Sequence, residues 1–253
     1  MARFLITGVS SGIGRVLTLR LVREGHTVWG IARRKDLLIN LKEELGNTEK
    51  FIYTPLDISE DKIWGTFVCN MRKNDFTPNV VIFNAAISKN DLIKGLDVGL
   101  TEKIFDVNFF SILCGIRDLL SVSSNKMQFI AISSSSAFKG SGVEGIGYSA
   151  SKAALSIAFE SLHQKYVGKH SFKVVFLGPV NFGMTPFKKG FPLSISVDTA
   201  VSGILKAVRG TRVLYFYPAL LFYFIKITKL FPSDLYFKIL SKMESFHVRM
   251  ERL

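Results

Sequence analysis

Tyr148 and Lys152 are the residues whose types and spacing point most directly to chemistry. They stand four residues apart in the segment 147–154, which places a phenol and an ammonium on the same face of a helix. A free tyrosine has a pKa of about 10, and a nearby cation stabilises the phenolate and lowers that pKa. Tyr148 is therefore a candidate general acid and base. The same spacing also arises by chance on helices, where the alternative is a half-buried tyrosine beside a solvated lysine.

A glycine-rich turn follows the first apolar run of the chain. Residues 2–7 are mostly apolar and lead directly into Gly8-Val9-Ser10-Ser11-Gly12-Ile13-Gly14, after which apolar residues recur at helical spacing. This order predicts a buried strand, a turn and a helix N-terminus. Glycines there permit positive φ and close backbone approach, so the free amides could bind the pyrophosphate of a dinucleotide. A purely structural turn is the alternative.

Two arginines follow the second predicted strand, residues 26–31. The end of this strand should lie near the ribose of a bound dinucleotide, where NAD binders place an acidic residue. The segment 25–35 contains no acid, and Arg33 and Arg34 occupy the expected place. Guanidinium groups are suited to bidentate binding of a 2′-phosphate. The sequence therefore predicts NADP(H) in preference to NAD(H), with two solvated arginines as the alternative.

These features resemble the short-chain dehydrogenase/reductase family over most of residues 1–185. Residues 7–14 resemble its Thr-Gly-x-x-x-Gly-x-Gly cofactor turn, and Asp57 resembles its adenine-contacting acid. The segment 83–86, Phe-Asn-Ala-Ala, resembles the family's Asn-Asn-Ala-Gly, with two of the four positions different. The resemblance implies a Rossmann fold and a cofactor site formed by Gly8, Ser10, Ser11, Gly12, Ile13, Gly14, Arg33, Arg34, Asp57, Ile58, Asn84, Ala85, Tyr148, Lys152, Pro179, Val180 and Thr185.

The last three of these come from a segment near the nicotinamide in the family. Leu177-Gly178-Pro179-Val180-Asn181 resembles the family's Pro-Gly segment, with leucine in place of the first proline. Thr185 is a loose match to a threonine that touches the pyrophosphate or the carboxamide. Residues 182–195, rich in glycine and proline, are expected to form a mobile substrate lid, with an ordinary surface loop as the alternative.

The resemblance also implies a catalytic serine within the run 133–136. Ser135 lies 13 residues before Tyr148, which is the spacing of the family's catalytic serine. Because four serines are consecutive, Ser134 and Ser136 remain alternatives.

The implied catalytic set is Ser135, Tyr148, Lys152 and Asn108. By this resemblance Tyr148 exchanges a proton with the substrate oxygen, and Ser135 hydrogen-bonds the same oxygen. Lys152 lowers the pKa of Tyr148 and holds the nicotinamide ribose, while Asn108 holds a water that links Lys152 to solvent. The implied reaction is hydride transfer between a nicotinamide and a carbonyl or alcohol carbon.

The length and periodicity of the chain fit one domain. Its 253 residues suit a single α/β domain, and strand patterns near 3–7, 27–31, 50–54, 79–83, 127–133 and 172–178 alternate with helical stretches. This alternation predicts a doubly wound parallel sheet. We expect a catalytic domain over 1–212 and a hydrophobic C-terminal extension over 213–253. Two cysteines suit a reducing, cytoplasmic compartment, and four scattered histidines predict no metal site.

The C-terminal extension carries a run of apolar and aromatic residues. All 13 residues from Val213 to Ile225 are apolar or aromatic, which is shorter than the roughly 20 that span a bilayer. Nine basic and three acidic residues follow Ala200, a net charge of +6. Basic residues beside aromatic ones favour peripheral contact with an anionic membrane. The alternative is a last strand followed by a helix that covers the substrate cleft or a subunit interface.

We therefore predict an NADPH-dependent reductase of a carbonyl group, with a hydrophobic or lipid-like small-molecule substrate. The resemblance implies a homodimer or homotetramer. Two alternatives remain open: an NADP-dependent alcohol or sterol-type dehydrogenase working in the oxidative direction, and a non-catalytic regulator that senses NADP. The chain has 33 basic and 20 acidic residues, but no nucleic-acid-binding motif accompanies this charge, so no nucleic acid partner is expected.

Overall fold

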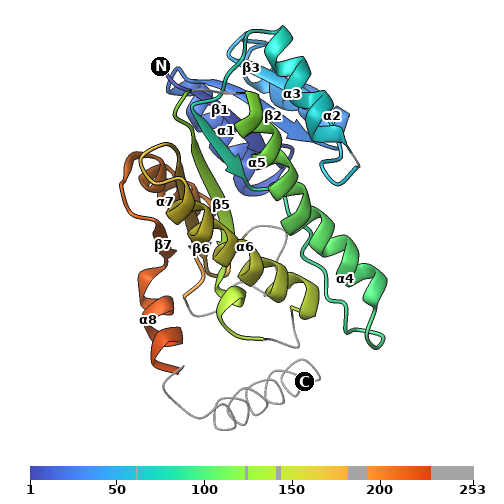
Figure 1. Ribbon diagram of the computed structural model, residues 1–253, viewed down its shortest axis with the longest axis vertical. Coiled ribbons are helices and arrows are strands. Elements are labelled where there is room, and N and C mark those ends of the chain that lie inside the picture. Colours follow the sequence, from blue (N-terminus) through green and yellow to red (C-terminus); the bar gives the residue numbers. More distant parts are fainter. Residues whose placement is uncertain (61, 123–124, 141–143, 182–192, 229–253) are drawn as a thin grey trace.

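Seven parallel strands form a single sheet in the order β3-β2-β1-β4-β5-β6-β7 (Figure 1). The computed structural model describes residues 1–60, 62–122, 125–140, 144–181 and 193–228. The chain winds outward in one direction from β1 to β3 and in the other from β4 to β7, so the predicted doubly wound α/β domain is confirmed. The strands are β1 (Arg3–Thr7), β2 (Thr27–Ala32), β3 (Phe51–Pro55), β4 (Val80–Phe83), β5 (Gln128–Ser134), β6 (Ser171–Leu177) and β7 (Leu214–Tyr217).

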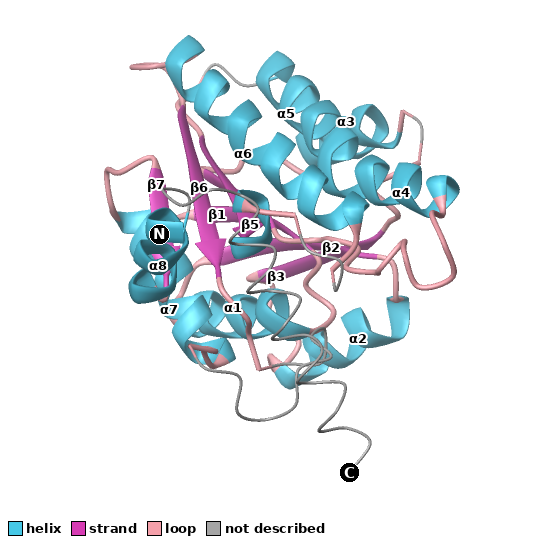
Figure 2. Cartoon of the chain, turned by 90° about the horizontal axis from the view of Figure 1, so that it is seen from below, coloured by secondary structure: helices cyan, strands magenta, loops and turns pink. Residues whose placement is uncertain are grey.

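The central strands are apolar on both faces because helices cover both sides of the sheet. In β1, Phe4 and Ile6 pack into one core and Leu5 packs into the other, and each of the three is at most 2% exposed. Figure 2 shows α1, α2 and α7 on one face of the sheet and α3, α5 and α6 on the other. The helices of these layers are α1 (Gly12–Arg23), α2 (Lys35–Glu44), α3 (Ile63–Lys73), α4 (Val98–Phe105), α5 (Ser111–Val122), α6 (Ile146–Lys165) and α7 (Val197–Arg209).

Two short helical segments lie at the end of the sheet where the predicted site residues gather. The segment Asp106–Phe110 is a π-helical turn between α4 and α5 and contains Asn108. The 3₁₀ turn Ser135–Phe138 follows β5 directly. Such irregular turns within or beside regular elements often mark functional sites.

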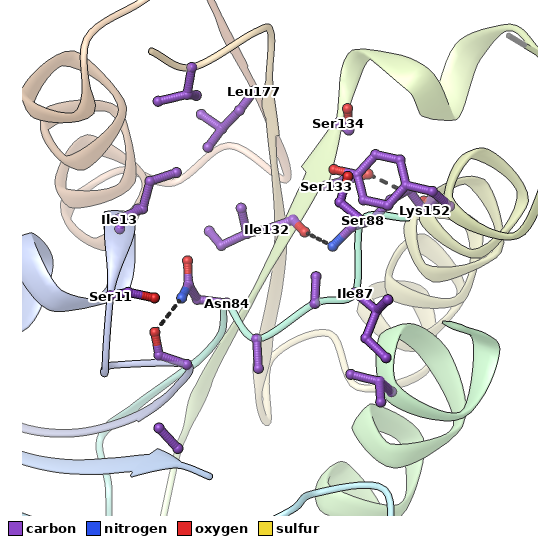
Figure 3. A pocket seen from close by; sticks show the side chains of 18 of the residues that line it. Ser11, Ile13, Asn84, Ile87, Ser88, Ile132, Ser133, Ser134, Lys152 and Leu177 are labelled. Carbon is purple, nitrogen blue, oxygen red and sulfur yellow. Dashed lines mark hydrogen bonds between the residues drawn. The ribbon is translucent and has the colours of Figure 1, made fainter. Parts of the chain in front are cut away.

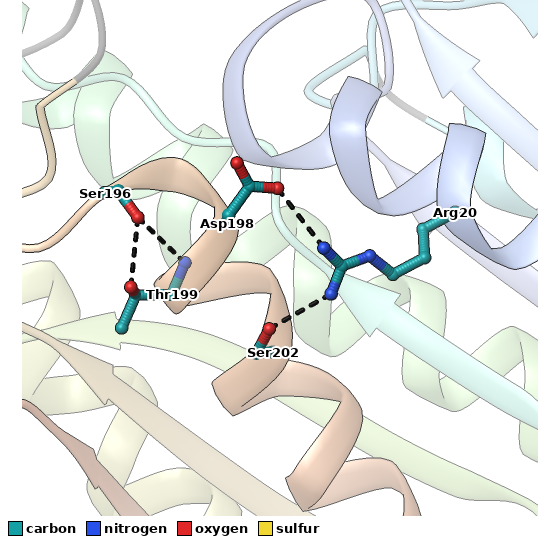
Figure 4. Close-up of polar contacts among 5 residues, drawn as sticks. All are labelled: Arg20, Ser196, Asp198, Thr199 and Ser202. Atoms are coloured by element: carbon teal, nitrogen blue, oxygen red, sulfur yellow. Dashed lines mark hydrogen bonds and ion pairs between the residues drawn. The ribbon is translucent and has the colours of Figure 1, made fainter.

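Helices from opposite ends of the chain are joined by polar contacts on one face (Figure 4). Arg20 of α1 donates to Ser202 Oγ at 3.0 Å and to Asp198 Oδ1 at 3.2 Å, both on α7. Ser196 caps α7, since its hydroxyl accepts a hydrogen bond from the Thr199 backbone amide at 3.1 Å. These contacts tie α7 to α1, and Ser196 defines the N-terminus of α7.

Strand β7, within the apolar run 213–225, pairs in parallel with β6 at the edge of the sheet. Helix α8 (Ala219–Thr228) follows it. Phe222 of α8 is 3% exposed and packs its ring 4.9 Å from that of Phe216. The opposite face of α8 carries four apolar side chains that are 53–66% exposed: Leu220, Tyr223, Phe224 and Ile227. The remainder of the predicted extension, 229–253, lies outside the described residues.

Candidate active site

One pocket lies at the carboxyl ends of β1, β2, β4, β5 and β6, the edge at which open α/β sheets bind ligands. Figure 3 shows Ser133, Ser134 and Lys152 on one side of it, and Ser11, Ile13 and Asn84 on the other. The pocket brings together most of the predicted site: Gly8, Ser10, Ser11, Gly12, Ile13, Arg33, Arg34, Asp57, Ile58, Asn84, Ala85, Ser135, Tyr148, Lys152, Pro179 and Val180.

Three predicted residues are not in this lining. Gly14 packs beneath the turn, and Asn108 lies behind the pocket wall, fully buried. Thr185 lies outside the described residues, as does most of the predicted lid, 182–195. Sequence reasoning missed Leu56, Ala86, Ile87, Ser88, Ser133, Glu144, Leu177 and Gly178, which also line the pocket.

The glycine turn has the shape that a pyrophosphate site requires. Gly8 and Gly12 have φ of 78° and 58°, which glycine adopts readily and other residues rarely do. A side chain at Gly14 would overlap the carbonyl oxygen of Gly8. The turn is tied to the end of β4, because Asn84 Nδ2 donates to Gly8 O at 3.2 Å and Thr7 Oγ1 accepts from the Asn84 amide at 3.1 Å. The residues present therefore fit a dinucleotide whose phosphates lie at the N-terminus of α1.

The departure from the family pattern at position 83 has a structural explanation. Phe83 is 1% exposed and points into the core on the α5 and α6 side. Its ring stacks on Phe129 at 6.5 Å and meets Trp64 and Phe159 edge-on at 6.1 and 6.3 Å. Aromatic packing thus stabilises the end of β4 and leaves Asn84 in place.

Both arginines after β2 face the pocket and have polar partners. Arg34 Nη2 donates to Ser11 Oγ at 2.8 Å and to Ser10 Oγ at 3.2 Å, which joins a guanidinium to the hydroxyls of the glycine turn. Arg33 Nη1 lies 3.4 Å from Asp57 Oδ2. Burial acts to raise the pKa of Asp57, but hydrogen bonds from Ser59 and the charge of Arg33 hold it below its usual value, so Asp57 is ionised.

Ser134 is the serine that acts on Tyr148. Tyr148 lies in the first turn of α6, and the hydroxyl of Ser134, the last residue of β5, acts to lower the pKa of its phenol. Ser134 Oγ also lies 2.9 Å from Ser136 Oγ and accepts from the Ser136 amide at 3.2 Å. Ser135 lines the same pocket as the first residue of the 3₁₀ turn. Both serines therefore lie in the pocket with Tyr148, and Ser134 is the one whose hydroxyl affects the Tyr148 pKa.

Lys152 lies one helical turn beyond Tyr148 and is 3% exposed. Its Nζ donates to the carbonyl oxygen of Ile132 at 2.8 Å and lies 5.8 Å from the centre of the Tyr148 ring. Burial lowers the pKa of Lys152 to about 8, because the ammonium loses water that it would otherwise bind. The pair predicted from the sequence is thus close together inside the pocket.

The pKa of Tyr148 differs from the expected one. Burial raises it to about 12; the carboxylate of Glu144 adds to this effect, and the hydrogen bond from Ser134 opposes it. The Lys152 ammonium donates to Ile132 O, and burial is the largest influence on the pKa of Tyr148. Glu144 was missed by the sequence reasoning, although it precedes Tyr148 by four residues; burial raises its own pKa to about 6. Tyr148 is therefore a protonated phenol at neutral pH.

Asn108 holds the wall of the pocket together. Its Oδ1 accepts from the Ile87 amide at 2.8 Å, and its Nδ2 donates to Ile87 O at 3.0 Å and to Ser151 Oγ at 3.1 Å. Both amide protons are therefore used by protein groups. The side chain thus connects the loop after β4 to Ser151 of α6, the residue before Lys152.

Residues 2–191 match the family model of the short chain dehydrogenases. The chain therefore belongs to this family, whose members are oxidoreductases, and the family prediction is confirmed. It is 29% identical over 60% of its length to an NADPH-dependent pterin aldehyde reductase of Arabidopsis thaliana, and 32% identical over 63% to an NADPH-dependent 1-acyldihydroxyacetone phosphate reductase of Saccharomyces cerevisiae. The aligned part spans 63% and 54% of those two proteins.

A solved structure shares the whole fold. The structure of a short chain dehydrogenase from Burkholderia cenocepacia in complex with NADP superposes with a TM-score of 0.73 at 20% identity, over 98% of this chain and 96% of that one. This agreement supports the strand order and the layers of helices described above.

Proposed function

We propose that this protein reduces a carbonyl group to a secondary alcohol with NADPH, and that Tyr148 donates the proton. The observation that carries the proposal is the arrangement of Tyr148, Lys152 and Ser134 in the same pocket as the glycine turn, with Lys152 Nζ 5.8 Å from the centre of the Tyr148 ring. Bound NADPH would supply the hydride. The protein's part is to hold the substrate oxygen at the Ser134 hydroxyl and the Tyr148 phenol.

The protonation states support reduction over oxidation. Tyr148 has a raised pKa of about 12, so the phenol carries the proton that a developing alkoxide needs. Lys152, with a pKa of about 8, is mostly protonated at neutral pH and stands beside the phenol. Oxidation of an alcohol would require the phenolate, which burial and Glu144 disfavour.

The preference for NADPH rests on Arg34 and the serines of the glycine turn. Arg34 with Ser10 and Ser11 forms a cluster of hydrogen-bond donors at the end of β2, where the ribose 2′-phosphate of NADP(H) would lie. Arg33, paired with Asp57, would flank the adenine. Two relatives described as NADPH-dependent support the same choice.

The substrate is proposed to be hydrophobic or lipid-like. The 3₁₀ turn after Ser134 ends at Phe138, whose ring lies 4.8 Å from Phe176 and 5.7 Å from Phe222 of α8. An aromatic cluster thus reaches from the catalytic serines to the C-terminal helix. The yeast relative named for an acyl-bearing substrate agrees with an apolar neighbourhood.

We also propose that α8 rests on an anionic membrane surface. Its exposed residues Leu220, Tyr223, Phe224 and Ile227 recur at helical spacing and form one apolar stripe, and α8 contains Lys226 but no acid. Among the described residues, no helix is both long and apolar enough to cross a membrane.

Self-association is proposed through a different surface. Val98, Phe110 and Ile157 are 52–65% exposed on α4, the π-helical turn and α6. A homodimer or homotetramer that buries these three side chains would leave the pocket open. Light scattering of the purified protein measures the mass of the assembly and so tests this proposal.

Cofactor titration followed by turnover on a carbonyl series tests the proposed reaction. NADPH should bind more tightly than NADH, and turnover should rise with the chain length of ketone or aldehyde substrates. Tight NADPH binding without turnover on any carbonyl would contradict the reductase and favour an NADP-sensing role.

A further inference from the structure

Asp91 is a buried carboxylate outside the pocket that meets the first turn of α6. It is 1% exposed and lies in the loop between β4 and α4. Its Oδ1 accepts from the Ile146 amide at 2.7 Å, and its Oδ2 accepts from the Gly147 amide at 2.7 Å and from Thr101 Oγ1 at 2.6 Å. A residue 55 positions away thus binds the free amides at the start of the helix that carries Tyr148.

The start of α6 is shaped to receive this carboxylate. Gly145 has φ of 80°, and a side chain at that position would overlap Asp91 Oδ1. A Cβ at Gly147 would lie 2.9 Å from Oδ2 and 3.1 Å from Ile104. Only residues without side chains allow the acid to approach this closely. The fit therefore depends on Gly145 and Gly147 as well as on Asp91.

Asp91 is ionised where it lies. Burial acts to raise its pKa, but the hydrogen bonds from Thr101, Gly147 and Ile146 outweigh burial and hold the pKa below its usual value. A negative charge also suits the positive end of a helix dipole. The contact is thus a charge-assisted cap.

The same loop is anchored at its other end to the cofactor site. It starts at Asn84, which is bonded to the glycine turn, and Asn108 holds its Ile87 by two hydrogen bonds. The loop therefore spans from the pyrophosphate site to the helix of Tyr148, which it contacts through Asp91.

We propose that Asp91 is a positioning residue that holds the first turn of α6 in the register where Tyr148 meets Ser134. This inference rests on the proposed reductase function. An error of about 1 Å in the position of a reacting group can lower a rate by about 100-fold, so the anchor matters although Asp91 touches neither substrate nor cofactor.

Asp91→Asn tests this, with Asp97→Asn as a matched control. The carboxamide introduced by Asp91→Asn would keep an acceptor for one helix amide and turn a donor toward the other. Asp97 is an exposed acid in the same loop that caps α4 through the Leu100 amide at 2.9 Å. Asp91→Asn should lower kcat by about 10- to 100-fold, leave the Kd for NADPH within about twofold, and increase the isotope effect with deuterated NADPH, since hydride transfer becomes slower. Asp97→Asn should change none of these.

A second variant and a second measurement distinguish a loss of positioning from a loss of folding. Thr101→Val removes one bond to Asp91 but leaves both helix amides capped, so its kcat should stay within about threefold of the parent. Hydrogen exchange of the Ile146 and Gly147 amides should accelerate in Asp91→Asn and not in Asp97→Asn. Unchanged exchange, or full kcat in Asp91→Asn, would overturn the inference. A parent protein without turnover would contradict the reductase function, while the exchange data would still decide whether Asp91 holds the helix.

Discussion

Ser134, at the end of β5, and Tyr148, in the first turn of α6, line the same pocket, and the Ser134 hydroxyl acts to lower the pKa of the Tyr148 phenol. The two hydroxyls come from the sheet and from a helix, and a substrate oxygen would be held by both. Ser135, only one residue further, belongs to the turn that leads away from the strand.

Ser134→Ala should therefore cost more activity than Ser135→Ala. Loss of a hydrogen bond to the substrate oxygen is expected to lower kcat/KM by about 100-fold, as for removal of one donor to a developing oxyanion. Ser135→Ala should stay within about threefold of the parent. Steady-state kinetics of both variants decide the assignment, and the reverse ranking would restore Ser135.

Glu144→Gln should change the pH dependence of the reverse reaction. The ionised carboxylate raises the pKa of Tyr148, so the neutral amide should lower that pKa and make the phenolate more available. The rise of alcohol oxidation with pH should then begin at lower pH in the variant. Glu160→Gln, on the exposed side of α6, is the control and should leave the profile in place. If the pH profiles of alcohol oxidation coincide for Glu144→Gln and the parent, the charge of Glu144 does not affect the pKa of Tyr148.

Arg34→Ala should lower the affinity for NADPH by about tenfold or more and the affinity for NADH by less than about threefold. A charge-assisted hydrogen bond contributes about 1.5–3 kcal/mol. NADH has no 2′-phosphate, so it does not form this hydrogen bond with Arg34 and loses little when Arg34 is replaced. The exposed neighbour Lys35 provides the control, since Lys35→Ala keeps the donor cluster. Fluorescence titration measures both affinities, and equal losses for the two cofactors would rule out 2′-phosphate recognition by Arg34.

Substitutions of Phe222 and Phe224 on α8 test the stability of the fold and the membrane contact separately. Phe222 is 3% exposed, so Phe222→Ala should lower the free energy of unfolding by about 3 kcal/mol or more. Phe224 is 61% exposed, so Phe224→Ala should change stability by less than about 0.5 kcal/mol. Its effect should instead be weaker sedimentation with anionic liposomes. Parent protein that fails to bind such liposomes at low salt would contradict membrane contact.

Much of the fold could be predicted because its determinants are local. Continuous apolar runs such as Phe4 to Ile6 mark strands covered on both faces, and the glycine turn has a spacing that few other structures need. Tyr148 and Lys152 were identified because helical periodicity brings them together.

The unpredicted features depend on packing between distant segments. Counting 13 residues from Tyr148 selects Ser135, but the count crosses the turn after β5 and cannot show that Ser134 lies in the same pocket. The raised pKa of Tyr148 follows from burial, and the cap on α6 comes from Asp91, 55 residues earlier in the chain. Such contacts leave no periodic signal in the sequence.

Tyr148→Phe tests the central claim most directly, because it removes one hydroxyl and keeps the ring. Turnover of the best carbonyl substrate and the Kd for NADPH should be measured together in the same preparation. The proposed mechanism predicts a fall in kcat of about 100- to 10,000-fold with the NADPH affinity nearly unchanged. A variant that retains more than about a tenth of the parent rate would show that another group donates the proton.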